Sequence, residues 1–316
     1  MQKTIPMSRH RVAFVATTLV LLAAPVGLTV CSQSAAAATI DVFPGVGTLQ
    51  AAIDAASDGD HLRLHPGTYT GAVSVTKPLS IRTASPFVVI DAGCTAPVAL
   101  EIAADGVTMV GNFARSGIAA PGTQVAGGTA TQIRIANHSN VRLQDIGPTA
   151  SECGSEQDGI EVSGSSSNVR LKYMYTTGFP GAGVHLSGLA IGARVLFQGS
   201  RHRGGDMLYD GTGLLIENSA KGAGLGQARI KVERMFFTEE SVAGIHVVNS
   251  DGILIKKNNV EANATGAVGI ALDATSDANL INDNSWNPNG STDTAFVDDG
   301  SGNCGAGNNF AVAPCP

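Results

Sequence analysis

Two short sequence patterns alternate along the second half of the chain, and each recurs roughly every 25 residues. The first pattern has apolar residues at Ile133, Ile160, Val184, Leu214, Ile245 and Ile270. The second has apolar residues at Leu143, Leu171, Phe197, Val232, Ile255 and Ile281. Because the two patterns interleave with one shared period, each repeat contains one strand of each kind. This regularity constrains the fold more than any other feature of the sequence.

A single repeat of this size cannot bury its apolar side chains, whereas repeats stacked as successive coils can. Alternation along a strand then places Ile133 and Ile135 inside and Arg134 outside. Asparagines near the repeat ends suit tight bends with positive φ; they are Asn137, Asn218, Asn249, Asn258 and Asn284. We therefore predict an all-β fold, a right-handed parallel β-helix. A leucine-rich repeat has a similar period, but its leucine consensus is missing here.

The region before the regular repeats predicts a cap and the first coils. Thr48–Ala56 is a short amphipathic helix candidate, and alternating strands follow at 61–65, 73–75, 79–82 and 88–90. We expect a signal peptide over residues 1–38 and one domain over 39–316. Within that domain, 39–130 forms the cap and first coils, 131–286 the regular coils and 287–316 the tail.

The N-terminus has the features of a secretory signal peptide. Basic residues precede the apolar segment Val12–Val30, and Ala35–Ala38 offers small-residue cleavage sites. A retained membrane anchor is the alternative, which Pro25 and Gly27 disfavour because they interrupt the apolar segment. We therefore expect secretion to the cell exterior or the envelope, with no membrane attachment after cleavage.

Acidic residues outnumber basic ones. Cleavage after Ala38 would remove Lys3, Arg9 and Arg11 and no acidic residue, so the net charge would change from −6 to −9. This balance disfavours nucleic acid and anionic membranes as partners. A local basic patch could still bind an acidic polymer, and we expect the protein to be a monomer.

Four cysteines remain after the expected cleavage, an even number that indicates disulfides in an exported chain. Three pairings are open. We favour Cys94–Cys153 with Cys304–Cys315, because the second pair closes a short loop in a tail rich in glycine and asparagine.

The segments Gly59–Tyr69 and Val73–Ile81 resemble the opening of secreted right-handed β-helix proteins of the pectate-lyase-like superfamily. The helix before them resembles the N-terminal cap of those proteins, and Asp298–Cys315 resembles their terminal segment. The resemblance covers nearly all of the expected mature chain. It implies the fold, and it implies polysaccharide lyase, C5-epimerase or glycoside hydrolase activity, or an adhesin without catalysis. No catalytic motif of those enzymes transfers residue by residue, and Asp251 is interpreted as a turn residue.

On consecutive coils, the outward positions of the first strand series contain a cationic residue, an acidic residue and a histidine, which are Arg134, Glu161 and His185. Glu101 fits one coil earlier. Such groups suit proton abstraction next to a uronate carboxylate, with Arg134 neutralising the carboxylate and His185 or another base taking the C5 proton. The alternative is a solvated ladder of cross-strand charge pairs.

The second series directs a basic stripe outward, which suits either the binding of an anionic glycan or the ordinary charged protection of a sheet. Its members are Arg142, Arg170 and Lys231, with Lys172 and Lys256 two residues on from the equivalent position. The longest insertion, Arg201–Gly211, is expected to be a loop that overhangs the His185 face. Its side chains suggest roles in the site: Arg201 and Arg203 as carboxylate clamps, His202 or Tyr209 as proton donor, and Asp206 as a further acid.

Calcium is the one cofactor that the sequence suggests, through Asp206 and Asp210, although their spacing matches no standard calcium loop. No metal ligand set is identified.

The leading hypothesis is a secreted protein that acts on a uronate-containing polysaccharide by β-elimination or C5-epimerisation. The alternatives are a non-catalytic glycan-binding or surface protein, and a glycoside hydrolase that pairs Glu161 with Asp206 or Asp210.

Overall fold

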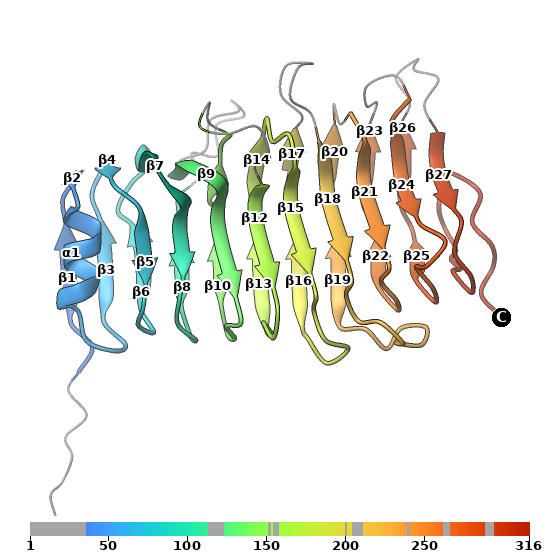
Figure 1. Ribbon diagram of the computed structural model, residues 1–316, viewed down its shortest axis with the longest axis horizontal. Coiled ribbons are helices and arrows are strands. Elements are labelled where there is room, and N and C mark those ends of the chain that lie inside the picture. The colour runs from blue at the N-terminus through green and yellow to red at the C-terminus, as the bar shows by residue number, and fades with distance from the viewer. Residues whose placement is uncertain are drawn as a thin grey trace, which may run out of the picture. The chain divides into compact units, whose positions relative to one another are not determined.

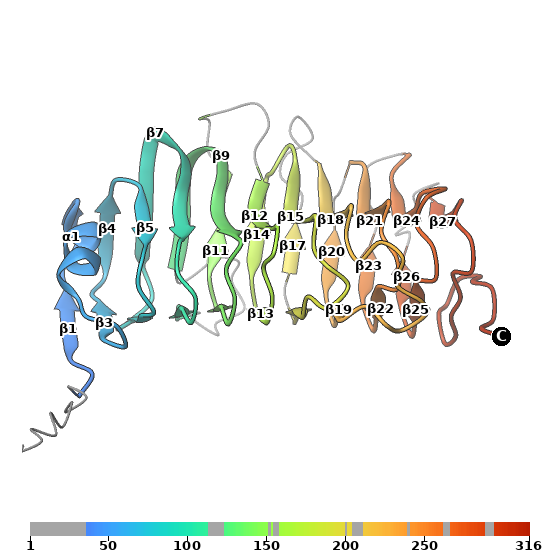
Figure 2. The same cartoon turned by 60° about the horizontal axis from the view of Figure 1, so that its bottom comes forward.

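Strands of successive repeats pair in parallel, so that the unit from Ala37 to Pro316 is a stack of coils (Figure 1 and Figure 2). The computed structural model describes residues 36–112, 123–150, 153, 158–199, 201–203, 211–238, 241–261, 266–287 and 294–316, with the backbone alone for 201–203.

The described strands form three sheets that run along the stack. Sheet A contains β1 (Thr39–Val42), β3 (His61–Leu64), β6 (Ser80–Thr83), β8 (Thr108–Val110), β10 (Arg142–Gln144), β13 (Val169–Lys172), β16 (Val195–Gln198), β19 (Ile230–Glu233), β22 (Leu254–Lys256) and β25 (Leu280–Asn282). Sheet B contains β2 (Gly45–Val46), β4 (Gly67–Thr70), β7 (Val88–Ile102), β9 (Thr123–Ala136), β12 (Asp158–Ser163), β15 (Ala182–Ser187), β18 (Thr212–Glu217), β21 (Ala243–Val248), β24 (Val268–Leu272) and β27 (Thr294–Asp298), with β5 (Val73–Val75) beside β7 and β11 (Gly147–Pro148) beside β9.

The third, short sheet was not predicted from the repeat. It contains β14 (Tyr175–Thr177), β17 (Arg201–Arg203), β20 (Phe236–Thr238), β23 (Asn259–Glu261) and β26 (Ser285–Asn287). Its strands have three residues each, which is too short for an alternating pattern to stand out in the sequence.

The register confirms both predicted apolar series. In sheet B, Ile160 lies opposite Ile133 on one side and Val184 on the other. In sheet A, Leu171 lies opposite Leu143 in the same way. These side chains are fully buried. Burial of an aliphatic side chain of this size contributes about 1.5–3 kcal/mol, so the stacked columns supply most of the driving force for folding.

The asparagines divide into two groups. Asn137, Asn218 and Asn249 have positive φ values of 64°, 51° and 44°, as predicted for bends. The same prediction is wrong for Asn258 and Asn284, which are buried inside the corner of the coil. There the Asn258 side-chain amide and backbone N–H both donate to Asn284 Oδ1, at 2.9 and 3.0 Å. A buried ladder of amides therefore satisfies backbone groups where the chain turns.

The helix α1 (Thr48–Ala55) lies at the N-terminal end of the stack (Figure 1). Leu49 and Ile53 are its buried residues. Lys77 Nζ donates to the carbonyl oxygens of Ile53, Asp54 and Ala56, at 3.1, 2.7 and 2.6 Å. A lysine at this position neutralises the negative end of the helix and satisfies its last carbonyl groups.

Both ends of the expected domain make contacts with the coils. Ala38 N donates to Asp60 Oδ1 at 2.7 Å, and Ala38 O accepts from His61 N, so the first coil begins before Thr39. The end of the signal peptide at Ala38 stays a prediction. At the other end, β27 extends sheet B into the segment expected to form the tail. In the described part of the chain, no helix has the length and apolar character needed to span a bilayer.

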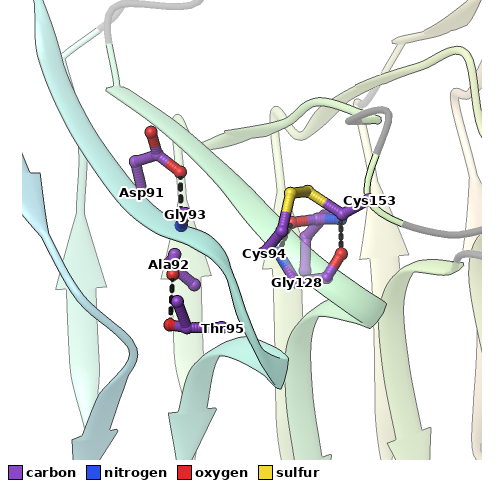
Figure 3. The surroundings of a disulfide bond; sticks show 8 residues. Asp91, Ala92, Gly93, Cys94, Thr95, Gly128 and Cys153 are labelled. Atoms are coloured by element: carbon purple, nitrogen blue, oxygen red, sulfur yellow. Dashed lines mark hydrogen bonds between the residues drawn. A yellow bond between two sulfur atoms is a disulfide. The ribbon is translucent and has the colours of Figure 1, made fainter.

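Both favoured cysteine pairings are present as disulfides. Cys94–Cys153 joins the turn within β7 to the segment after β11 (Figure 3). That turn includes a hydrogen bond from Gly93 N to Asp91 Oδ1 at 2.8 Å. Cys304–Cys315 closes the C-terminal loop. Disulfides are typical of chains that fold in an oxidising compartment, which is compatible with secretion.

We predict that Asn284→Ala lowers the free energy of unfolding by about 2–4 kcal/mol, because it leaves buried donors of Asn258 and the carbonyl of Ile255 unpaired. Chemical denaturation followed by circular dichroism measures the change. Asn259→Ala is the matched control, since that side chain is on the outer face of β23, and it should cost under about 1 kcal/mol. Equal losses in the two variants would contradict the role of the ladder.

Candidate functional site

The predicted ladder is present on the outer face of sheet B. Glu101 on β7 lies opposite Arg134 on β9, Arg134 opposite Glu161 on β12, and Glu161 opposite His185 on β15. Consecutive rungs are about 4.8 Å apart, so four polar side chains extend over about 14 Å of the sheet surface. The structure therefore brings together the three ladder residues predicted from the sequence, together with Glu101.

Beyond His185 the ladder becomes largely apolar. Leu215, His246 and Ala271 occupy the next rungs in order. His246 is thus separated from His185 by one leucine, and no carboxylate of the described residues forms an ion pair with it as Asp158 and Glu217 do with His185. In this column, the run of consecutive polar residues ends at His185.

Two carboxylates hold the imidazole of His185. Nδ1 lies 2.9 Å from Asp158 Oδ2, and Nε2 lies 3.2 Å from Glu217 Oε1. The contact with Glu217 is close enough for an ion pair but is not aligned as a hydrogen bond. His185 Nε2 is buried, and among the described residues it has no hydrogen-bond partner. Nε2 is therefore the ring nitrogen with unused hydrogen-bonding capacity.

The surroundings of His185 favour the imidazolium form. Burial alone would lower the pKa of the ring, but the hydrogen bond and charge of Asp158 and the charge of Glu217 outweigh it, so the pKa of His185 is raised above 6.5. At His246 burial outweighs the charge of Asp273, which acts in the opposite direction, so the pKa of His246 is lowered below 6.5. The two histidines of one ladder therefore favour opposite protonation states.

The local backbone explains how Asp158 reaches His185. Strand β12 has two successive buried residues, Gly159 and Ile160, which place Asp158 on the same outer face as Glu161. A Cβ at Gly159 would lie 2.4 Å from the carbonyl oxygen of Gly183, so only glycine fits this close approach. Asp158 Oδ1 accepts from Ala182 N at 2.7 Å, which fixes the carboxylate against the next coil and leaves Oδ2 for the imidazole.

The N-terminal half of the ladder is a charge pair beside a hollow. Arg134 Nη2 donates to Glu101 Oε1 at 2.7 Å, and both side chains are more than a third exposed, so the pair contributes about 0–1 kcal/mol. Both residues line a hollow of about 210 Å³ that also includes Ser74 and Pro97. Glu161 Oε1 accepts from Ser163 Oγ at 2.8 Å. Arg134 and Glu101 therefore form the kind of cross-strand charge pair that the alternative interpretation, a solvated ladder, predicts.

The whole group is more acidic than the sequence indicated. Four carboxylates, from Glu101, Asp158, Glu161 and Glu217, surround two cationic groups. Arg134 already pairs with Glu101, so a substrate carboxylate would have to compete with Glu101 for the guanidinium. No cluster of three or more metal-binding side chains occurs within the described residues.

The other predicted residues lie elsewhere. The basic stripe is on sheet A, where Arg142 lies opposite Arg170, and Lys172 is two residues along β13. Lys231 is on β19 of the same sheet. The prediction of a loop from residue 201 is wrong at its start, since 201–203 form β17 of the short sheet.

The remainder of that insertion, which includes Asp206, Tyr209 and Asp210, lies outside the described residues. For Arg201, His202 and Arg203 the structure describes the backbone pairing with neighbouring strands and not the side chains. His202 is in register with Thr176 and Phe237, on a different sheet from His185.

Sequence reasoning missed the two carboxylates beside His185. Glu217 had a usable signal, because it is two residues after Leu215 on the same face and diagonal to His185. Asp158 had none, since strict alternation from Glu161 would place it on the buried face.

Comparisons with known proteins address the fold. A search of protein-family models and a search of curated protein sequences returned no match. An alginate lyase from Paenibacillus sp. strain FPU-7 superposes with a TM-score of 0.51 and 14% identity, over 83% of this chain and 99% of that one. A mannuronic acid-specific polysaccharide family 6 lyase from human gut microbiota gives 0.54 and 15%, over 82% and 61%. A PL6 family alginate lyase gives 0.50 and 16%, over 86% and 39%.

These structures are right-handed parallel β-helices of the pectate-lyase-like fold. The predicted fold and the resemblance stated from the sequence are therefore confirmed. The chain spans less than two thirds of the length of the second and third lyases. Identities of 14–16% establish the fold alone.

We predict that His185 titrates above pH 6.5 and His246 below it, because carboxylates surround the first ring and burial dominates at the second. NMR titration of the imidazole signals, assigned with His185→Gln and His246→Gln, measures both. A pKa of His185 below that of His246 would contradict the contacts described here.

The same shifts give stability effects of opposite sign. A raised pKa stabilises the fold below pH 6.5, and this contribution is lost as the pH rises through the folded-state pKa of His185. The lowered pKa of His246 stabilises the fold above pH 6.5, and this contribution is lost as the pH falls through its folded-state pKa. The two glutamine variants should therefore lose opposite parts of the wild-type pH dependence.

Proposed function

We propose that the protein is a secreted enzyme that binds a uronate-containing polysaccharide across sheet B and removes the C5 proton of one uronate. The observation that carries this proposal is the position of His185, held between Asp158 and Glu217 and one rung from Glu161. Support also comes from the fold, which the chain shares with structures described as alginate lyases.

In this proposal the polymer lies along the stack, so that successive sugars meet successive rungs. Arg134 and the imidazolium of His185 supply positive charge near the substrate carboxylate, which makes the C5 proton more acidic. Glu161, between them in the ladder, takes that proton as general base.

Two reactions begin with this step. In β-elimination the C5–H and C4–O4 bonds break and a C4–C5 double bond forms. His185 Nε2, which is buried beside Glu217 in the free protein, must turn toward the bound sugar in this proposal, and it then donates its proton to O4. In C5-epimerisation the C4–O4 bond stays intact, and a proton returns to C5 from the opposite face. The products distinguish the two, because only elimination produces unsaturated chain ends.

A non-catalytic glycan-binding protein is the second candidate. The observation that favours it is the excess of carboxylates around His185, which opposes the approach of a polyanion to that face. In a glycoside hydrolase, which is the third candidate, two carboxylates would act on the glycosidic bond and new reducing ends would appear without unsaturation.

The test uses the purified mature protein with pectins, alginates and glycosaminoglycans, with and without Ca²⁺. Absorbance of unsaturated uronates, reducing ends and NMR of the uronate signals report elimination, hydrolysis and epimerisation. We predict that His185→Ala and Glu161→Gln each lower turnover about 100-fold or more, as expected for loss of a general acid or base.

His246→Ala is the matched control, since it removes a histidine from the same ladder two rungs away, and it should retain wild-type turnover. Wild-type rates in both His185→Ala and Glu161→Gln would refute the proposed site. Binding without turnover on every polymer would favour the non-catalytic protein.

A pH dependence follows from His185 as the acid. The fraction of imidazolium falls as the pH rises through the raised pKa of His185, so the rate of elimination should fall over the same range. A profile of kcat/KM against pH measures this. A rate that rises through that range would assign the imidazole the role of base instead.

A further inference from the structure

Another hollow lies on sheet A, which is not the sheet that contains His185. It has a volume of about 520 Å³, and its lining includes the cationic side chains Arg170, Arg194, Arg229 and Lys231, with Glu233 as its carboxylate. The chain as a whole has a net charge of −6, so this gathering of positive charge runs against its overall balance. Two of the four residues, Arg194 and Arg229, do not belong to the stripe that the sequence predicted.

The strand register produces the cluster. Val195 at the start of β16 lies opposite Ile230 at the start of β19, so the arginines directly before them, Arg194 and Arg229, are on neighbouring rungs. Arg170 and Lys231 share a second column, on either side of Leu196. Four cations are thereby placed in two columns over three rungs, a length of about 10 Å.

The turns that lead into these strands are longer than their neighbours. Residues 188–194 and 218–229 join sheet B to sheet A in these two coils, whereas 164–168 and 249–253 do so on either side. The last residues of these longer turns, Arg194 and Arg229, line the hollow, and the turn before β19 bulges from the edge of the stack (Figure 1).

Asp251 fixes the longest turn in place. It is buried, and its carboxylate accepts from Lys221 Nζ at 3.1 Å and from Gly222 N at 2.6 Å. The turn packs so closely on Gly252, which has a φ of 67°, that a Cβ there would lie 2.8 Å from the carbonyl oxygen of Gly224. The interpretation of Asp251 as a structural turn residue fits these contacts, which hold the turn that ends at Arg229 against the next coil.

The four cations are exposed, and within the described part of the chain none of them has an ion pair with a carboxylate. Like charges on adjacent strands destabilise a sheet, so the cluster costs stability when nothing is bound. Arginine forks match the geometry of carboxylates and bind them in a bidentate manner. An extended polymer with a carboxylate on each sugar would place its charges against successive rungs.

We propose that this hollow is a second binding site for an anionic polysaccharide, one that holds polymer carboxylates through Arg170, Arg194, Arg229 and Lys231 without reacting with them. The proposal goes beyond the reaction at His185 and does not depend on turnover there. It gives the protein two glycan-binding faces, one for chemistry and one for retention of the polymer.

The test measures binding of size-defined polygalacturonate and alginate fragments by isothermal titration calorimetry, in the His185→Ala background so that the polymer stays intact. We expect Arg194→Ala/Arg229→Ala to weaken binding about tenfold or more, because two charge-assisted contacts are lost. Binding should weaken as salt concentration rises, and carboxyl-reduced polymer should not bind. Arg82→Ala/Lys256→Ala is the matched control, since it removes two cations of sheet A that do not line the hollow.

Near-wild-type affinity in the control together with loss in the Arg194/Arg229 variant supports the site. Equal weakening in both variants would overturn the proposed site. So would the absence of polyuronate binding to the protein that keeps Arg194 and Arg229. Turnover of short oligosaccharides, measured with Arg194→Ala/Arg229→Ala in the otherwise wild-type chain, separates the two proposals. Failure of the His185 reaction leaves the binding result unchanged, and failure of binding leaves turnover at His185 unchanged.

Discussion

Backbone hydrogen bonds between successive coils hold each residue against its equivalent one rung away, at a spacing of about 4.8 Å. The register that stacks Ile133, Ile160 and Val184 in the core is the same register that aligns Arg134, Glu161 and His185 outside. A slip of one residue would turn the apolar column outward and the charged column inward. Core packing therefore fixes the geometry of the candidate site.

The corners of the coils depend on buried polar side chains. Asn258 and Asn284 satisfy backbone groups of neighbouring coils, and Ser219 and Ser250 do so at another corner, where Ser219 N donates to Ser250 Oγ at 2.9 Å. An unpaired buried amide would cost about 1–3 kcal/mol, so these columns are as necessary as the apolar ones. They keep the strands in register, and so they keep the outward side chains at fixed spacing.

The two main sheets carry opposite charge. The outer face of sheet B presents four carboxylates around His185 and Arg134, whereas sheet A gathers four cations in one hollow. Both groups form because equivalent positions of successive coils lie in one column along the stack. The two proposals fit this separation, because proposed chemistry that needs an imidazolium and proposed retention of a polyanion make different demands on a surface.

The sequence by itself determined the coil period, both apolar columns, the short helix that begins at Thr48 and the ladder from Arg134 to His185, because each depends on periodicity along the chain. It also indicated both disulfides. Only the tertiary structure decided that Asp158 joins His185, since a break in alternation at Gly159 changes the face. It likewise revealed the short sheet, the burial of Asn258 and Asn284, and the hollow around Arg194 and Arg229. These features depend on how turns of unequal length pack on neighbouring coils, and periodicity does not encode that packing.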